Sequence, residues 1–248
     1  AIDKPYGKEI RGCLTCPEGY TLCGADMTSL EDTTKRHYMK PLDPEYVEEM
    51  SKEGFDPHLD LAKHAGVITQ DDIDKHNSGE RSLSSLRKNY KVVNYSATYG
   101  VGASTLSRNT GMPTKDAKKL LEAFWSRNWS VYKVASTART RDLFGSTWLY
   151  NPVSEFWYSL RSDKDRFSTL NQGTGVFCFD SWVSLCRRYG IKTIGQFHDE
   201  IIALVSEGEE EQTKVTMEQA IENLNNNLEL NVPLGVDAQF GKTYADIH

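Results

Sequence analysis

The sequence predicts an α+β fold, in which both ends of the chain build one sheet domain and a helical segment is inserted between them. Residues 20–26 form a strand-like run that ends on a carboxylate, Asp26. Near the other end, apolar runs at 191–197 and 201–205 flank His198-Asp199-Glu200, which indicates a β-hairpin with these polar residues at its turn. Helical patterns dominate the sequence between these strands.

Local signals set the expected limits of the helices. Ser82 or Ser84 is a plausible amino-terminal cap for a helix over 82–99, and Gly100 follows its end. Further helices are expected in the acidic segment broken by Pro44, Gly54 and Pro57, and at 115–127, 168–188 and 213–228. Residues 144–156 resemble a turn-rich strand region.

Composition narrows the class of protein. A chain of 248 residues, 38% hydrophobic and 26% charged, can bury a sizeable core. No stretch approaches the roughly 18 apolar residues of a membrane span, and residues 1–8 lack the apolar centre of a signal peptide. Five cysteines, an odd number, favour a reducing compartment, so we expect a cytoplasmic protein with no membrane partner. Cys13 and Cys16 have CxxC spacing in a strand-like run, and they are either structural thiols or half of a zinc site.

The charge is unevenly distributed although the net charge is −6. Residues 81–141 contain twelve Lys or Arg and two acidic residues, whereas residues 41–80 contain eleven acidic residues and three lysines. A basic segment within an acidic protein can bind phosphates locally, although a solvated helical face would show the same pattern.

Two carboxylates are the first candidates for chemistry. Asp26 at a strand end and Asp199 at a hairpin turn could each be an ordinary turn residue. Together at adjacent strand ends they could instead hold two Mg²⁺ ions, which prefer carboxylate and phosphate oxygens. Two such ions can activate an attacking hydroxyl and stabilise the leaving oxygen of an in-line displacement.

A helical stripe is the second candidate. Arg87, Lys91, Tyr95 and Tyr99 are spaced four residues apart, so they share one helix face that is cationic at one end and aromatic at the other. A nucleoside triphosphate has matching halves, an anionic tail and a stackable base. A basic surface helix with buried tyrosines remains the alternative.

These elements match three family motifs in order. Gly24-Ala25-Asp26-Met27-Thr28-Ser29-Leu30-Glu31 resembles motif A of the DNA polymerase I family (family A). The pattern Arg87-xxx-Lys91-xx-Asn94-Tyr95-xxx-Tyr99-Gly100 resembles motif B, and Phe197-His198-Asp199-Glu200 resembles motif C. Residues 54–58 are similar to the segment whose histidine contacts the triphosphate, and 167–172 to the helix that touches the primer–template minor groove.

The resemblance implies a role for each matched residue. Asp26 and Asp199 would ligate two Mg²⁺ (Mn²⁺ as a substitute) with help from the Met27 carbonyl, and Glu200 would lie beside them. The dNTP would contact six side chains: Arg87, Lys91 and His58 at the triphosphate, Tyr95 at the sugar, Tyr99 at the nascent base pair, and Glu31 at C2′, where it would exclude ribonucleotides. Lys91 would also protonate the leaving pyrophosphate. His198, Gln172 and Ser168 would contact the primer–template DNA.

The resemblance also implies an architecture with parts missing. The expected palm, residues 1–43 and 161–248, is a small antiparallel sheet backed by helices, and the helical fingers occupy 44–160. No thumb, proofreading exonuclease or 5′-nuclease can be assigned to the sequence. We therefore expect a separate polypeptide or an upstream segment to supply the thumb and exonuclease, and weak, salt-sensitive binding of DNA by this chain alone. Tyr95 and the short connections suggest a bacteriophage source and the cytoplasm of an infected bacterium.

Two departures from the family pattern affect these expectations. Asp32 and Thr33 follow Glu31 where the family commonly has Leu-Arg, which removes a cation near the site. Ser168 stands where an asparagine is usual, which shortens or removes a minor-groove hydrogen bond.

Two other functions remain open. A non-catalytic nucleic-acid-binding module with this fold predicts loss of a metal ligand, yet both aspartates are present. A two-metal nuclease or phosphatase predicts a denser cluster of carboxylates and histidines, and would leave the Arg–Lys–Tyr helix without a role.

Overall fold

The computed structural model describes residues 4–247 and divides the chain into two compact units. The sheet unit comprises residues 1–37 and 172–248, and the helical unit comprises residues 38–171. Both divisions fall inside continuous helices, α2 (Leu30–Met39) and α10 (Arg166–Arg188). A helix keeps its backbone hydrogen bonds across such a division, so no loop signal marks it in the sequence.

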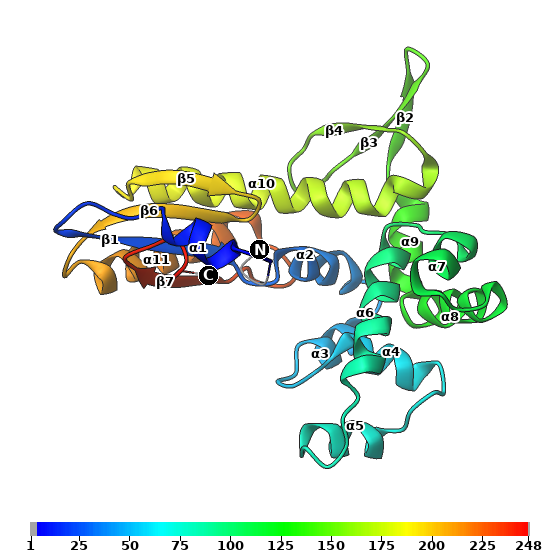
Figure 1. The fold of residues 1–248 in the computed structure, drawn as a ribbon. Coiled ribbons are helices and arrows are strands. Elements are labelled where there is room, and N and C mark those ends of the chain that lie inside the picture. The colour runs from blue at the N-terminus through cyan, green and yellow to red at the C-terminus, as the bar shows by residue number, and fades with distance from the viewer. Residues whose placement is uncertain (1–3, 248) are drawn as a thin grey trace. The chain divides into compact units, whose positions relative to one another are not determined.

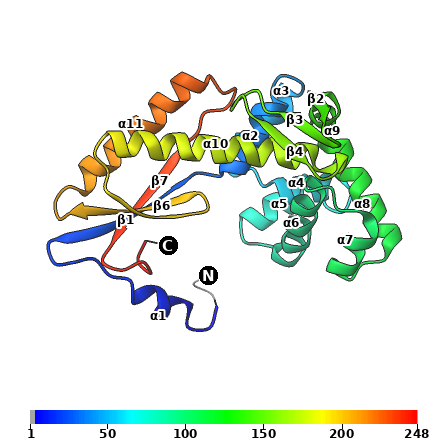
Figure 2. The ribbon, with the colours of Figure 1, turned by 90° about the horizontal axis from the view of Figure 1, so that it is seen from above.

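The sheet unit contains an antiparallel sheet with the strand order β5-β6-β1-β7. Its strands are β1 (Tyr20–Met27), β5 (Thr193–Phe197), β6 (Glu200–Ser206) and β7 (Val236–Gly241). The expected strand at 20–26 and the expected hairpin are therefore confirmed. The helices α10 and α11 (Glu210–Leu228) both lie along one side of this sheet (Figure 1, Figure 2).

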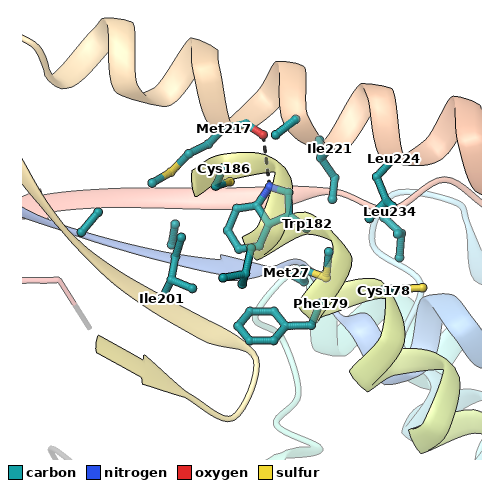
Figure 3. Close-up of a cluster of buried hydrophobic side chains, with 14 of the residues drawn as sticks. Met27, Cys178, Phe179, Trp182, Cys186, Ile201, Met217, Ile221, Leu224 and Leu234 are labelled. Carbon is teal, nitrogen blue, oxygen red and sulfur yellow. Dashed lines mark hydrogen bonds between the residues drawn. The ribbon is translucent and has the colours of Figure 1, made fainter. Parts of the chain in front are cut away.

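Alternation along the strands decides which side chains enter the core. Cys23, Ala25 and Met27 of β1 point to the same face as Ile201 of β6, where α10 and α11 cover them. Trp182 of α10 is fully buried in this cluster, and its indole N–H donates to the Met217 carbonyl of α11 at 3.3 Å (Figure 3). A large ring with a satisfied N–H thereby joins the two helices over the strands.

The opposite face of the sheet has a thinner cover. Leu22 and Ile202 pack there against Tyr244 and Ile247 from the end of the chain. The short helix α1 (Gly7–Gly12) precedes β1, and Thr15 forms an isolated bridge with Thr243. The strand-like interpretation of the Cys13–Cys16 run holds only in part, because Cys13 follows α1 in a helical conformation whereas Thr15 lies in this bridge.

The helical unit is built mainly of short helices around its own core. They are α3 (Pro44–Met50), α4 (Pro57–His64), α5 (Gln70–Asn77), α6 (Ser84–Thr98), α7 (Ala103–Thr110), α8 (Thr114–Arg127), α9 (Trp129–Thr137) and the 3₁₀ turn η1 (Asp163–Asp165). Buried residues of α4, α6, α7 and α8 share one apolar cluster, which includes Leu59, Val93, Leu106 and Phe124.

A second antiparallel sheet belongs to the helical unit. It consists of β2 (Thr140–Leu143), β3 (Ser146–Tyr150) and β4 (Trp157–Leu160) in that order. The strand region expected at 144–156 therefore differs in its limits. The β2–β3 hairpin begins at Thr140, before the expected region, and β4 begins at Trp157, just beyond its end. Leu149 and Leu160 bury one face of this sheet against Leu170.

The helix expected at 82–99 is confirmed, but its start differs from the expectation. Leu83 occupies the N-cap position and no side chain caps the helix, so the serine cap is wrong. The carboxyl end follows the sequence signal: Gly100 has φ +70°, and the N–H groups of Gly100 and Val101 bond to the carbonyls of Ala97 and Ser96. This pair of bonds is a Schellman motif, which favours glycine at that position.

No helix among residues 4–247 combines the length and the apolar character needed to cross a bilayer.

Candidate active site

Asp26 reaches the thinly covered face of the sheet because of its position in β1. Leu22, Gly24 and Asp26 alternate with the core residues, so they point away from α10 and α11. Asp26 is exposed, whereas its neighbours Ala25 and Met27 are buried. Gly24 leaves room here: a Cβ at this position would lie 2.9 Å from both the Glu200 Oε1 atom and the Ile247 carbonyl oxygen.

The β5–β6 turn brings Asp199 to the end of β1. His198 adopts a left-handed conformation with φ +52° at this turn, and the N–H of Met27 donates to the Asp199 carbonyl at 3.2 Å. Glu200, the first residue of β6, pairs directly with Asp26 in the strand register. The His198 Nδ1 atom lies 3.2 Å from Asp199 Oδ1, and their side chains are 81% and 40% exposed.

These residues surround a cavity of about 380 Å³ in the sheet unit. Four expected residues line it, namely Asp26, His198, Asp199 and Glu200. Phe197 of motif C also lines it. The other lining residues, which the sequence did not predict, come from both chain ends and the edge of the sheet: Arg11, Gln239, Tyr244 and Ile247. The positive charge of Arg11 and its position shortly before motif A in the sequence are the only features that could have marked it as a site residue.

Arg11 and Tyr244 form part of the cavity wall together. The Arg11 guanidinium lies 4.8 Å from the centre of the Tyr244 ring, and Phe197 stacks with the same ring at 5.9 Å. The Tyr244 hydroxyl donates to Glu200 Oε2 at 3.3 Å. A cation and a hydrogen-bond donor thus face an otherwise acidic site.

Glu200 is a buried carboxyl group that lies beside two other acidic residues. Burial raises its pKa to about 7; the hydrogen bond from Tyr244 and the charge of Arg11 oppose this, and the negative charges of Asp26 and Asp199 add to it. Asp26 also pairs with Asp237 of β7, so Asp237, Asp26 and Glu200 form one cross-strand row. Like charges in such a row are unfavourable without a bound cation.

The donor set fits hard divalent cations. Asp26 offers an exposed carboxylate and Asp199 a half-buried one on the cavity wall, which suits ions held by one or two carboxylates together with substrate phosphates. Among residues 4–247, no three His, Cys, Asp or Glu side chains are grouped closely enough to hold a metal ion unaided.

In the helical unit, α6 carries the predicted stripe on its outer face. Tyr90, Val93 and Ala97 are buried on the opposite face of this helix. Lys91 is exposed and Tyr95 is 50% exposed, and the Lys91 Nζ atom lies 5.8 Å from the centre of the Tyr95 ring. Tyr99 is half-buried at the end of the helix.

The packing of α4 against α6 assembles the rest of this group. Asp56 caps α4 by accepting from the amides of His58 and Leu59 at 2.8 and 3.0 Å, and it also accepts from the Arg87 guanidinium. Asn94 Nδ2 lies 3.1 Å from His58 Nδ1, and the His58 and Tyr95 rings are 6.0 Å apart. The sequence pattern did not predict Asp56 as the partner of Arg87.

The structure therefore brings together two sets of predicted residues, each within one unit. The sheet unit gathers Asp26, His198, Asp199 and Glu200, and the helical unit gathers His58, Arg87, Lys91 and Tyr95. His58 is only 7% exposed, which contrasts with the open position of Lys91.

The remaining predicted residues lie on the two continuous helices. Glu31 is half-buried in the first turn of α2. Ser168 and Gln172 are one turn apart on α10: Gln172 is exposed, whereas Ser168 is buried and its hydroxyl donates to the Asp165 carbonyl at 3.0 Å. Asp32, at the position that departs from the family, pairs with Arg36 at 2.9 Å, so a cation lies one turn further along α2.

None of the five cysteines, all of which lie in the described part of the chain, forms a disulfide. Cys13 and Cys16 donate to the carbonyls of Glu9 and Tyr20 at 3.3 and 3.0 Å. Burial raises the pKa of Cys23, Cys178 and Cys186 to about 12, which makes these three thiols unreactive.

Comparison with known proteins identifies the class first. A solved structure described as the POL domain of Pol1 from M. smegmatis in complex with DNA primer-template and dNTP aligns with a TM-score of 0.74 at 21% identity. The alignment covers 100% of this chain and 44% of that one. The fold is therefore that of a polymerase domain.

Sequence relatives identify the family. The model of DNA polymerase family A matches residues 1–142. The thermostable DNA polymerase I of Thermus filiformis is 26% identical over 260 residues, which cover 99% of this chain and 29% of that protein. DNA polymerase I of Lactococcus lactis subsp. lactis is 26% identical over 256 residues, covering 96% and 27%. The chain belongs to DNA polymerase family A, and it spans less than a third of the length of these relatives.

Proposed function

We propose that this chain is the catalytic part of a DNA polymerase, which transfers a nucleotide from a dNTP to a primer 3′-OH and releases pyrophosphate. One observation carries the proposal: the β5–β6 turn sets Asp199 beside the end of β1, where Asp26 and Glu200 are paired across the strands. Family membership supports the same reaction.

Asp26 and Asp199 would hold two Mg²⁺, or Mn²⁺, and the Met27 carbonyl would assist. When bound, such a pair of ions activates the attacking hydroxyl and stabilises the leaving oxygen. The cross-strand row of Asp237, Asp26 and Glu200 supports this assignment, because neighbouring carboxylates favour added positive charge. In this scheme Glu200 lies beside the ions without being an obligatory ligand.

The outer face of α6 would bind the incoming nucleotide. Arg87 and Lys91 would neutralise the triphosphate, and Lys91 would protonate the pyrophosphate as it leaves. Tyr95 would contact the sugar, with Tyr99 near the nascent base pair and Glu31 excluding a 2′-hydroxyl. His58 would join the triphosphate contacts once its ring is exposed, since it is buried beside Asn94 here.

The primer–template DNA would contact His198, Gln172 and Ser168. Gln172 is exposed and can reach a minor groove. Ser168 is buried and bonded to the backbone, so its contribution would be small. A separate polypeptide or upstream segment would supply the thumb and exonuclease, because the chain matches less than a third of its relatives.

Primer extension with Mg²⁺ tests the catalytic proposal. Asp26→Asn and Asp199→Asn should each abolish extension, whereas Asp180→Asn, which changes an exposed carboxylate of α10, should leave it intact. Normal extension by either site variant would overturn the assignment. DNA binding without extension by the unaltered chain would favour the non-catalytic module, and metal-dependent shortening of the primer would favour a nuclease.

A second measurement tests the need for a partner. Extension by this chain alone should be distributive and should fall steeply between about 50 and 200 mM salt, because thumb contacts to phosphates are missing. Processive extension by this chain alone at physiological salt would contradict the proposal.

A further inference from the structure

The small sheet of the helical unit has one face that its core does not use. Leu149 and Leu160 point inward to the cluster around Leu170, so the alternate residues of each strand point outward. The outward residues are Arg141 and Leu143 of β2, Ser146, Trp148 and Tyr150 of β3, and Trp157 and Ser159 of β4. No acidic residue is among these described positions, although Asp142 on β2 points to the inner face.

Arginines and aromatic rings are stacked on this outer face. The Arg141 guanidinium lies 3.9 Å from the centre of the Trp157 ring. Arg139, whose carbonyl accepts from the Tyr150 amide, lies 5.2 Å from the rings of both Tyr150 and Trp157. Tyr150 and Trp157 are themselves cross-strand partners with their rings 5.2 Å apart. Arg139 and Arg141 are exposed, so the outer side of each guanidinium faces solvent.

We propose that this outer face binds single-stranded DNA. A guanidinium stacked on an indole presents a flat cationic surface on which an unpaired base can stack. The N–H groups at its edge remain able to pair with phosphates. Aromatic platforms with nearby cations bind single strands with little sequence preference, because every base has a π face.

Charge and shape both favour this ligand. Arg139 and Arg141 close the basic segment 81–141, and the face itself adds no negative charge. A duplex keeps its bases stacked inside, so it can offer phosphates but no open base to the rings. The choice of DNA rests on the proposed polymerase function, whereas the binding geometry rests on the helical unit alone.

Fluorescence anisotropy of a labelled oligo-dT of roughly 20 nucleotides, without dNTP or metal, measures this binding. Arg139→Gln/Arg141→Gln should weaken oligo-dT binding at least tenfold. The control Arg187→Gln/Arg188→Gln removes the same charge from exposed arginines of α10 and should change it less than threefold. Equal effects of the two pairs would overturn the proposal, since only bulk charge would then matter.

Two further variants separate stacking from charge and from loss of folding. Arg139→Lys/Arg141→Lys keeps the charge but removes the planar groups, so the salt dependence should persist while affinity falls. Trp157→Ala should weaken binding about 5- to 150-fold, the range for loss of one stacked base. Each variant must retain the circular dichroism spectrum of the unaltered chain, and each must bind blunt duplex as the Arg187/Arg188 control does.

These results are independent of catalysis. Loss of oligo-dT binding can be read in a chain that fails to extend primers, and extension can persist when the sheet is altered. Unchanged oligo-dT affinity in both the glutamine and the lysine variants would refute the binding face and leave the proposed polymerase function standing.

Discussion

The carboxylate of Asp56 serves two structural purposes that a pair of substitutions can separate. One oxygen caps α4 through the amides of His58 and Leu59, and the other accepts from Arg87 of α6. Asp56→Ala removes both interactions. Asp56→Asn keeps a neutral oxygen for the cap and removes the charge that pairs with Arg87.

The expected magnitudes follow from these contacts. Loss of a helix cap costs about 0.5 to 2 kcal/mol. The ion pair adds no more than about 1 kcal/mol, because the Arg87 side chain is 41% exposed and the pair is screened by solvent. We therefore expect Asp56→Ala to lower the free energy of unfolding by about 1 to 3 kcal/mol, and Asp56→Asn by less than about 1 kcal/mol.

The effect should also depend on pH. Burial by itself raises the pKa of Asp56, but hydrogen bonds from Arg87 and from the amides of Leu59 and His58 outweigh it and hold the pKa below its usual value of 3.8. Such a group contributes stability that is fully present above the unfolded pKa and is lost as pH falls through the folded pKa. The advantage of the unaltered chain over Asp56→Asn should thus be complete at about pH 7 and smaller at about pH 3.

Hydrogen exchange read by mass spectrometry over α4, together with urea unfolding, measures both effects. Amides of α4 should exchange about 5- to 150-fold faster in Asp56→Ala than in the unaltered chain, and Asp56→Asn should lie between them. The prediction fails if the two variants behave alike, because the cap would then contribute nothing. It fails equally if the difference from Asp56→Asn is the same at both pH values.

Three further substitutions probe other parts of the chain. Arg127→Met should destabilise the protein by about 2 to 4 kcal/mol in urea unfolding, because it removes the guanidinium that donates to both carboxylate oxygens of the buried Asp60. A loss of stability under about 1 kcal/mol would contradict this. Gly24→Ala should lower the free energy of unfolding by about 1 to 3 kcal/mol and reduce primer extension, because the added methyl group would press on the Ile247 carbonyl. An unchanged melting temperature would show that the site has room for a methyl group. Tyr95→Phe should raise discrimination against dideoxynucleotides in primer extension, because the tyrosine hydroxyl is proposed to replace the missing sugar hydroxyl; an unchanged ratio would remove that assignment.

Local patterns were sufficient for several elements of this fold. The strand-like run that ends on Asp26, the two apolar runs around Asp199 and the four-residue spacing from Arg87 all predict their structures correctly, because each depends on residues close together in the chain. The caps were less predictable: Gly100 ends α6 as expected, whereas Leu83 rather than a serine begins it. Tertiary packing can position a helix start without a side-chain cap, but a left-handed end strongly favours glycine.

By itself, the sequence determined the periodic elements and the order of its three motifs, and thereby the fold class. Only the tertiary structure decided that Arg11 and Tyr244 join Asp26 and Asp199 around one cavity, and that Asp56 pairs with Arg87. These contacts join residues far apart in the chain, and their geometry depends on how strands and helices pack. Periodicity records which face a side chain occupies, but it does not record which distant side chain lies opposite.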